Sequence, residues 1–175
     1  MRKPRRGGRG QSIAEFAITL PVLFFLLFGV MEGGLLMFSV GSARIAAGEA
    51  ARQESESGNA ANADQLTLQV IRNTALGTTS LSTVNHIDVY HLIENGNGTF
   101  TVDNSKYNKY NLDGTTYNGW TNTWPSSSRN VINGQSDFIG ITIYYTYYWK
   151  SGLVLGQPPL ALNQSFYVRL EPQTY

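Results

Sequence analysis

The sequence predicts an α+β protein in which a long, membrane-spanning N-terminal helix carries a second short helix and a small antiparallel sheet. The first observation is a largely apolar stretch that begins near residue 16 and continues to residue 43, with one interruption at Glu32. The second is a pair of strand-like segments around Asn95-Gly96-Asn97-Gly98, a sequence typical of a β-hairpin turn. The third is an Ile- and Tyr-rich segment at residues 138–149. Strands that follow helices and are joined by turns are typical of the α+β class.

Residues 11–56 are expected to form one long helix, with its transmembrane part at about residues 16–40. Ser12 is the expected N-cap, and Glu15 three positions later completes a capping box. A membrane span needs about 20 apolar residues, a length reached here only if Glu32 is tolerated near the outer boundary. Glu15 and Glu32 are 17 positions apart, or about 26 Å along a helix. The two carboxylates are therefore expected near opposite faces of one bilayer.

The surface of this helix carries features that favour contact with other helices. Pro21 removes one intrahelical hydrogen bond, so a kink is expected there. Gly29 and Gly33 form a GxxxG pair, and small residues continue beyond it at Gly34 and Gly41. Small side chains at such spacing let a second helix approach closely. We therefore expect specific helix–helix packing along this segment.

The ten residues before the helix form a separate basic leader. They contain five of the 13 basic residues and none of the 12 acidic ones, so their removal leaves a side-chain charge of 8 against 12, or −4. The pI near 8.0 therefore comes from the leader, and it does not indicate a surface that binds nucleic acid. By the positive-inside tendency, the leader is expected in the cytoplasm and the chain after the helix outside it.

The junction between leader and helix resembles the type IV prepilin processing site. Gly10 ends the basic segment, Gln11 follows, and Glu15 is the fifth residue after the glycine. In that family a prepilin peptidase cuts after the glycine, and the fifth residue of the mature chain is a glutamate. The resemblance implies cleavage between Gly10 and Gln11, with the Glu15 carboxylate paired to the new amine of Gln11 in the same or a neighbouring chain.

The helix itself is similar to the TadE-like pseudopilins of tight-adherence (Flp pilus) systems. The residues that carry this similarity are Glu15-Phe16-Ala17, Pro21, Gly29 and Glu32-Gly33, and they imply a role in assembly. A weaker similarity to the closing strand of TadE-like proteins returns at Phe166-Tyr167-Val168-Arg169-Leu170-Glu171-Pro172.

The resemblance implies a pilin-like fold and a pseudopilin or minor pilin-like subunit of a bacterial pilus used in adhesion and secretion. The expected partners are other pilin-like subunits, the prepilin peptidase, the inner membrane and the pilus assembly platform. The protein is expected to cross the inner membrane once, with its C-terminal domain outside the cytoplasm, and to reach the pilus or cell surface after assembly.

Residues 57–175 are expected to form the extracytoplasmic domain and to fold without the anchor. A helix at residues 63–76 presents Leu66, Val70 and Ile71 to the sheet, and Gly77 ends it. The sheet is expected to contain four strands, at residues 86–93, 99–102, 138–149 and 165–170. In the first strand, alternation places four side chains on one face: Ile87, Val89, His91 and Ile93. In the third, Ile139, Ile141 and Ile143 share the buried face.

Residues 103–136 are rich in Asn, Ser, Thr, Gly and Tyr and are expected to form a long exposed loop. Trp120 and Trp124 lie in this loop, where they can dock onto the domain or contact a partner. An alternative function follows from the second case: a signal-anchored extracytoplasmic domain that binds through the Tyr/Trp-rich loop. In this alternative no cleavage occurs at Gly10, so the mature N-terminus distinguishes the two functions. A third possibility is a conventional signal peptide ending at Gly41-Ser42-Ala43, but its apolar stretch is too long and contains Glu32.

Few residues suggest catalysis or metal binding. The chain has no cysteine, which excludes thiolate chemistry and disulfides. His86 and His91 are five positions apart on a predicted strand, so they point to opposite faces and no joint metal site is expected. The Gly134-Gln135-Ser136-Asp137 segment does not complete a nucleophile elbow. We therefore expect no cofactor and no enzymatic activity.

Overall fold

The computed structural model describes residues 8–152 and 157–172, and within this range it has an α+β architecture. The helices are α1 (Gly8–Ser57), α2 (Ala63–Asn73), α3 (Ala75–Thr78) and a short 3-10 turn, η1 (Ser126–Ser128). The strands are β1 (Ser82–Glu94), β2 (Phe100–Tyr110), β3 (Phe138–Tyr147) and β4 (Leu160–Arg169). The predicted fold class, a long helix followed by a short helix and an antiparallel sheet, is confirmed.

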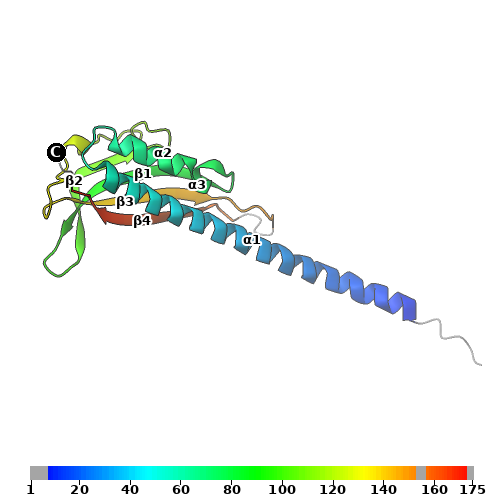
Figure 1. Cartoon of the computed structure of the whole chain (residues 1–175). Coiled ribbons are helices and arrows are strands. Elements are labelled where there is room, and N and C mark those ends of the chain that lie inside the picture. The colour runs from blue at the N-terminus through cyan, green and yellow to red at the C-terminus, as the bar shows by residue number, and fades with distance from the viewer. Residues whose placement is uncertain (1–7, 153–156, 173–175) are drawn as a thin grey trace, which may run out of the picture.

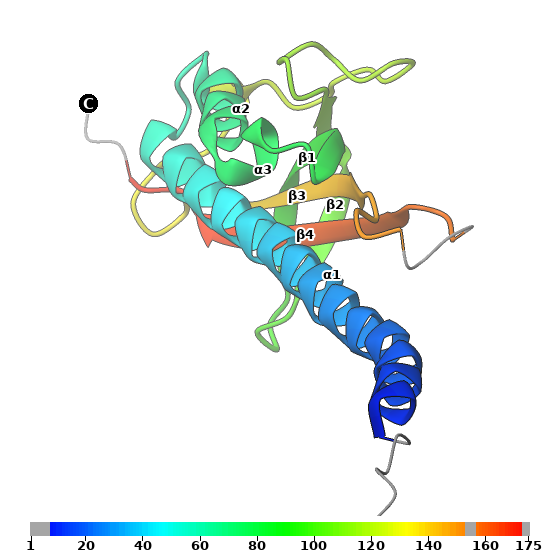
Figure 2. The ribbon, with the colours of Figure 1, turned by 90° about the vertical axis from the view of Figure 1, so that its right-hand side faces the viewer.

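The four strands form one antiparallel sheet in the order β2-β1-β3-β4. Helices α1 and α2 lie together on one face of this sheet, and α1 crosses it diagonally (Figure 2). The N-terminal half of α1 extends far beyond the sheet (Figure 1). We call this half, up to Met31, the stalk, and the rest of the described chain the head.

The core forms between the sheet and the two helices. From the sheet, the predicted face of Ile139, Ile141 and Ile143 is fully buried, together with Ile87 and Val89. From α1, the core receives five completely buried alanines: Ala43, Ala46, Ala47, Ala50 and Ala51. Small side chains let the α1 backbone lie close to α2 and to β3 and β4. This packing argues against the predicted independence of residues 57–175, because the C-terminal half of α1 is part of the core.

The buried side of α2 differs from the predicted stripe. Leu68 and Ile71 are fully buried, whereas Leu66 and Val70 are only half-buried. The buried stripe also includes the polar residues Asp64 and Thr67. The spacing of the apolar residues alone therefore predicted a face of α2 that is rotated about the helix axis from the face that is buried.

Gly77 does not end α2 as predicted. The helix stops at Asn73, Thr74 follows in extended conformation, and Gly77 lies within α3. A Cβ atom built at Gly77 would be 2.5 Å from the carbonyl oxygen of Arg72. The glycine is therefore needed because two backbone segments approach closely.

The sheet is more extensive than the sequence indicated. Strand β2 continues to Tyr110, so residues 103–110 belong to the sheet and the expected loop at 103–136 is wrong over that part. Strand β4 begins at Leu160, five residues earlier than expected. In β1, Leu92 is buried and Ile93 is 47% exposed. The shift between Tyr90 and Leu92 lies in the pairing with β2, whose strand carries the extra residues, whereas the pairing with β3 is regular from His86 to Leu92. The alternation of β1 is therefore kept, and Ile93 is exposed because it lies one residue beyond the last pair with β3, Leu92 with Phe138.

Candidate assembly helix

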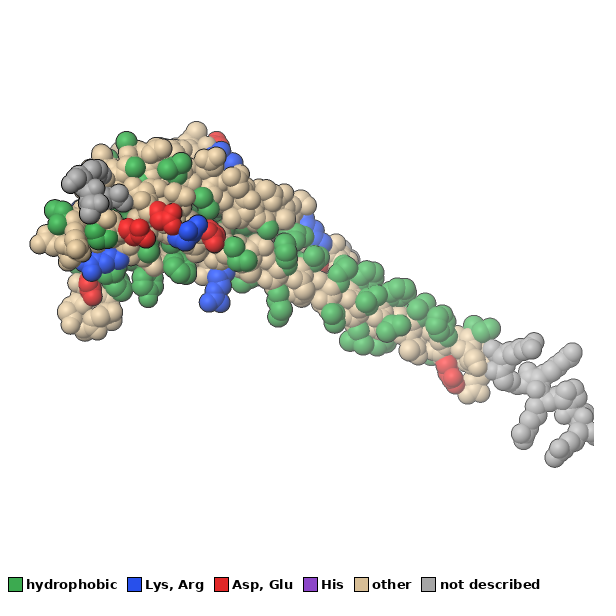
Figure 3. All heavy atoms as spheres, in the orientation of Figure 1, with side chains coloured by type: hydrophobic (Ala, Val, Ile, Leu, Met, Phe, Trp, Pro, Cys, Tyr) green, Lys and Arg blue, Asp and Glu red, His purple; other side chains and the backbone are tan. Residues whose placement is uncertain are grey.

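The projecting part of α1 is apolar and makes almost no contact with the rest of the molecule. It is long and apolar enough to cross a membrane, and none of its most apolar 18-residue stretch is buried. Hydrophobic side chains cover much of the face of the stalk that Figure 3 shows. Their exposed fractions include 64% for Phe16, 57% for Val22 and 77% for Val30. A soluble protein rarely exposes so much contiguous apolar surface, so this segment requires lipid or other helices around it.

The predicted cleavage site lies in the first turns of α1. The helix begins at Gly8, before Gly10 and Gln11, so Ser12 is not an N-cap and the predicted capping box does not form. Instead the Gln11 side-chain amide donates to a carboxylate oxygen of Glu15 over 2.9 Å. Residues 1–7 of the expected leader lie outside the described residues. Gln11 and Glu15 are thus neighbours on one face of the helix, one turn apart.

The α1 helix is not interrupted at Pro21. The helix is one element through this residue, and the Thr19 hydroxyl donates to the carbonyl oxygen of Glu15 over 2.9 Å. Phe24 and Phe28 stack with their ring centroids 6.0 Å apart. The predicted glycine positions Gly29 and Gly33 have open space where a Cβ would lie. Their surface is therefore free for close approach by another helix.

Glu32 joins the stalk to the head. Its carboxylate is 4% exposed and accepts a hydrogen bond from the Tyr147 hydroxyl over 2.5 Å. It also accepts from the backbone N–H of Lys150, over 3.1 Å, and of Ser151, over 2.6 Å. We call this arrangement the Glu32 clasp. Counted from Gly10, Glu32 is the first buried residue of α1, so the head begins to cover the helix at this point. The predicted membrane span of residues 16–40 therefore extends into the covered part of the helix.

A buried ionic network holds the other end of α1. Arg129 donates to both Glu54 of α1 and Asp64 of α2, and all three residues are at most 5% exposed. Thr67 also donates to Glu54, and Tyr110 donates to Asp64 over 2.5 Å. The Arg129 guanidinium lies 4.7 Å from the centre of the Trp124 ring. We call these residues the Arg129 network.

The charges of this network are unequal, since two carboxylates face one guanidinium. Burial raises the pKa of the Glu54 carboxyl to about 7, against the lowering effect of Arg129. The two carboxylates raise the pKa of Arg129 although burial opposes them. The network therefore fixes α1, α2 and the segment after η1 in one arrangement, because a buried charge is costly without its partners.

The two tryptophans of the 111–137 connection differ in position. Trp124 is 1% exposed and docks onto the domain, as one of the two predicted cases required. Trp120 is 40% exposed, and the Lys109 ammonium lies 4.7 Å from the centre of its ring. The loop thus contributes to the core and leaves only part of its aromatic surface for a partner.

The two histidines make separate contacts. His91 Nδ1 lies 3.2 Å from a carboxylate oxygen of Asp103, and its Nε2 lies 3.4 Å from Asp137. His86 stacks on Tyr144 at 4.3 Å between ring centroids, and burial lowers its pKa. Each ring therefore belongs to its own local network.

Sequence reasoning did not identify the Arg129 network or the partners of Glu32. Glu54, Asp64 and Arg129 are 10 and 65 positions apart along the chain, so no local spacing connects them. Glu32 was selected for its place in the apolar helix, and its partners come from residues 115 to 119 positions away. The sequence offered one indication of these partners: Glu32 is a single charged residue in an apolar segment, and such a residue needs a partner.

The stalk and head together define a class of protein in which a single apolar N-terminal helix carries an α+β domain. Within that class, the family model described as TadE-like protein matches residues 10–52, and this confirms the resemblance of the N-terminal segment. The match begins at Gly10, includes Glu15 and Glu32, and ends in the part of α1 that packs on the sheet. No curated protein and no solved structure is significantly similar to the chain. The similarity at residues 166–172 lies outside the matched segment and stays a prediction.

Proposed function

We propose that the protein is a pseudopilin or minor pilin-like subunit of a tight-adherence (Flp) pilus assembly system. The TadE-like segment itself fits a protein associated with such a pilus. The observation that supports the finer proposal is the position of this segment, which covers both the exposed stalk and its junction with the head. The proposed role is assembly rather than catalysis.

In this proposal, a prepilin peptidase cuts between Gly10 and Gln11 at the inner membrane. The cut changes the backbone amide of Gln11 into an amine that carries a positive charge. Glu15 is one turn away and exposed, so its carboxylate is available to that amine or to the amine of a neighbouring subunit. In a region of low dielectric, a paired carboxylate is strongly favoured over a lone one.

The stalk then packs against the helices of other pilin-like subunits. Phe16, Pro21, Gly29 and Gly33 lie on the part of α1 that the head leaves uncovered. The head lies outside the cytoplasm, and the Glu32 clasp and the Arg129 network keep it at a constant position on the helix. A change in helix packing is therefore transmitted to the head as a rigid body.

The experiment that tests this role compares Glu15→Gln with wild-type protein. The substitution retains size and hydrogen-bonding capacity but removes the charge. We expect the variant to insert and to be cut, yet to recover far less of the partner pilins in co-purification from membranes. Glu49→Gln, at an exposed position on the same helix, is the matched control and should recover partners as wild type does. Equal recovery with Glu15→Gln would reduce Glu15 to a residue that only stabilises the helix start.

The alternative of a domain that binds through its Tyr/Trp-rich loop is less well supported. Trp124 is inside the core, and Trp120, although 40% exposed, has the Lys109 ammonium 4.7 Å from the centre of its ring. Of the two tryptophans of the loop, Trp120 alone is therefore exposed to a partner.

A further inference from the structure

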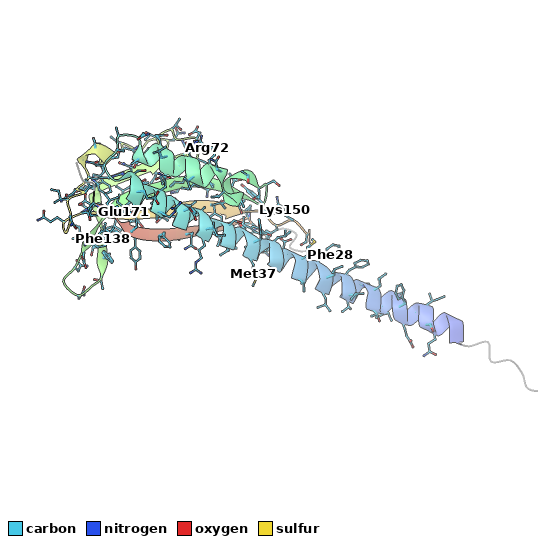
Figure 4. The ribbon with its side chains drawn as sticks, viewed as in Figure 1. Phe28, Met37, Arg72, Phe138, Lys150 and Glu171 are labelled. Atoms are coloured by element: carbon cyan, nitrogen blue, oxygen red, sulfur yellow. The ribbon has the colours of Figure 1, made fainter. Side chains whose placement is uncertain are left out.

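The end of the head from which α1 emerges carries a short segment with interfacial character. Directly after β3, the chain places Tyr148, Trp149 and Lys150 in sequence, and we call these three residues the base. Tyr148 is 40% exposed, Trp149 is half-buried and Lys150 is exposed. Figure 4 shows Lys150 at this end of the head, with Phe28 farther out on the stalk.

The Glu32 clasp fixes the level of the base along α1. The backbone N–H of Lys150 donates directly to the Glu32 carboxylate, and the Tyr147 hydroxyl donates to the same group. The base is therefore held beside one defined turn of the helix. Two further contacts limit its movement: Trp149 Nε1 donates to the Pro158 carbonyl over 3.0 Å, and Lys150 Nζ donates to the Ser80 carbonyl over 2.7 Å.

The length of the uncovered stalk sets where this turn lies in a membrane. Residues 11–31 are 21 residues, and at 1.5 Å per residue they extend about 31 Å. The hydrocarbon core of a bilayer is about 30 Å thick. With Gln11 at the inner boundary, Glu32 lies at the outer boundary, and the clasp places the base in the layer of lipid headgroups.

We propose that the base is a lipid-contacting surface that rests on the phospholipid headgroups of the outer leaflet. This inference rests on the membrane insertion assumed in the proposed function. Tyr and Trp are enriched at this depth because their rings are apolar and their polar atoms need hydrogen bonds. The Lys150 ammonium gives one hydrogen bond to Ser80, so the donors that remain of its three can meet a lipid phosphate. Glu32 thereby acts as a positioning residue that sets the height of the head above the membrane.

Tryptophan fluorescence tests this proposal with the full chain in phosphatidylcholine–phosphatidylglycerol vesicles. The probe lipids carry bromine either near the head of the acyl chain or near its terminal methyl group. The chain contains three tryptophans, Trp120, Trp124 and Trp149. We expect the shallow label to quench wild-type fluorescence more than the deep label does. Trp149→Phe should lose this shallow quenching, whereas the control Trp120→Phe should retain it.

A second reporter separates this inference from membrane insertion. Val22 is near the middle of residues 11–31, so Val22→Trp should be quenched most by the deep label when the stalk is inserted. Deep quenching of Val22→Trp without shallow quenching of Trp149 would overturn the contact of the base while leaving insertion intact. Absence of both would overturn insertion as well. A circular-dichroism spectrum like that of wild type ensures that each variant is folded.

Discussion

The Tyr147 hydroxyl donates to the Glu32 carboxylate over 2.5 Å, and this bond joins the end of β3 to the middle of α1 across 115 positions of the chain. It is one of several hydrogen bonds to a carboxylate that the head buries almost completely. The presence of a glutamate in the middle of this helix thus has a structural explanation, because Glu32 attaches the head to α1 at the point where the stalk meets the head.

Replacing Glu32 should weaken the attachment of the head. Glu32→Gln keeps one carbonyl oxygen but turns an NH₂ group toward the N–H donors of Lys150 and Ser151. Leaving buried donors unsatisfied should lower the free energy of unfolding by about 1–3 kcal/mol. Urea unfolding of the full chain in detergent measures this loss. The exposed control Glu49→Gln should change stability by less than about 1 kcal/mol, and an equal effect of both variants would contradict the account.

Removal of α1 should prevent the head from folding. A fragment of residues 58–175 lacks the five buried alanines and Glu54, so it should show no cooperative unfolding transition. A fragment of residues 32–175 keeps the clasp and the Arg129 network and should unfold cooperatively. Circular dichroism during a urea titration compares the two. Cooperative unfolding of the shorter fragment would restore the division at residue 57 that the sequence predicted.

Loss of Arg129 should be far more damaging than loss of an exposed arginine. Arg129→Met leaves Glu54 and Asp64 buried without their cation, which should cost about 3–5 kcal/mol of unfolding free energy. Arg52 is paired only at the surface, with Glu49 and Glu56, so Arg52→Met should cost at most about 1 kcal/mol. Urea unfolding at neutral pH measures both. Comparable losses would show that the network contributes little.

Stability should fall with rising pH through the titration of Glu54. Burial raises the pKa of this carboxyl from its ordinary value of 4.5 to about 7, so the folded state holds the proton more tightly than the unfolded chain does. The stabilising contribution is fully present below about pH 4.5 and is lost as the pH rises toward about 7. Glu54→Gln cannot ionise, so its stability should fall less over this range.

Other groups also titrate in this region. Burial raises the pKa of Asp88, which acts in the same direction as Glu54, and lowers the pKa of His86, which acts in the opposite direction. Comparison of wild type with Glu54→Gln at each pH isolates Glu54, because these groups are present in both. Identical pH profiles of the two proteins would contradict the assignment.

Local patterns in the sequence predicted much of the sheet. The alternation of Ile139, Ile141 and Ile143 identified the buried face of β3, since the period of side chains in a strand is two residues. The turn at residues 95–98 also forms, with Gly98 at a φ of 76°, a conformation that suits glycine. These features depend on neighbouring residues alone, so one sequence suffices to find them.

The interactions that connect distant segments could not be predicted. The spacing of Ala43, Ala47 and Ala51 resembles the small-residue pattern of a membrane helix, but the structure uses it to bring α1 close to the sheet. Arg129 lies in a stretch that is polar and looks exposed, yet it is buried between two helices. Ile93 is exposed because it lies beyond the last residue of β1 that pairs with β3, a limit that the alternation in β1 does not show. In each case the deciding contact comes from a residue far away in sequence.

The central claim, that the chain is processed and assembled as a pilin-like subunit, is tested most directly by the mass of the protein made beside its cognate prepilin peptidase. We expect wild-type protein that begins at Gln11, and Gly10→Val that keeps the full precursor mass because a side chain blocks the cut. Gly8→Val should be trimmed like wild type and serves as the control. Wild-type protein that begins at Met1 or near Arg44, or normal trimming of Gly10→Val, would contradict the account.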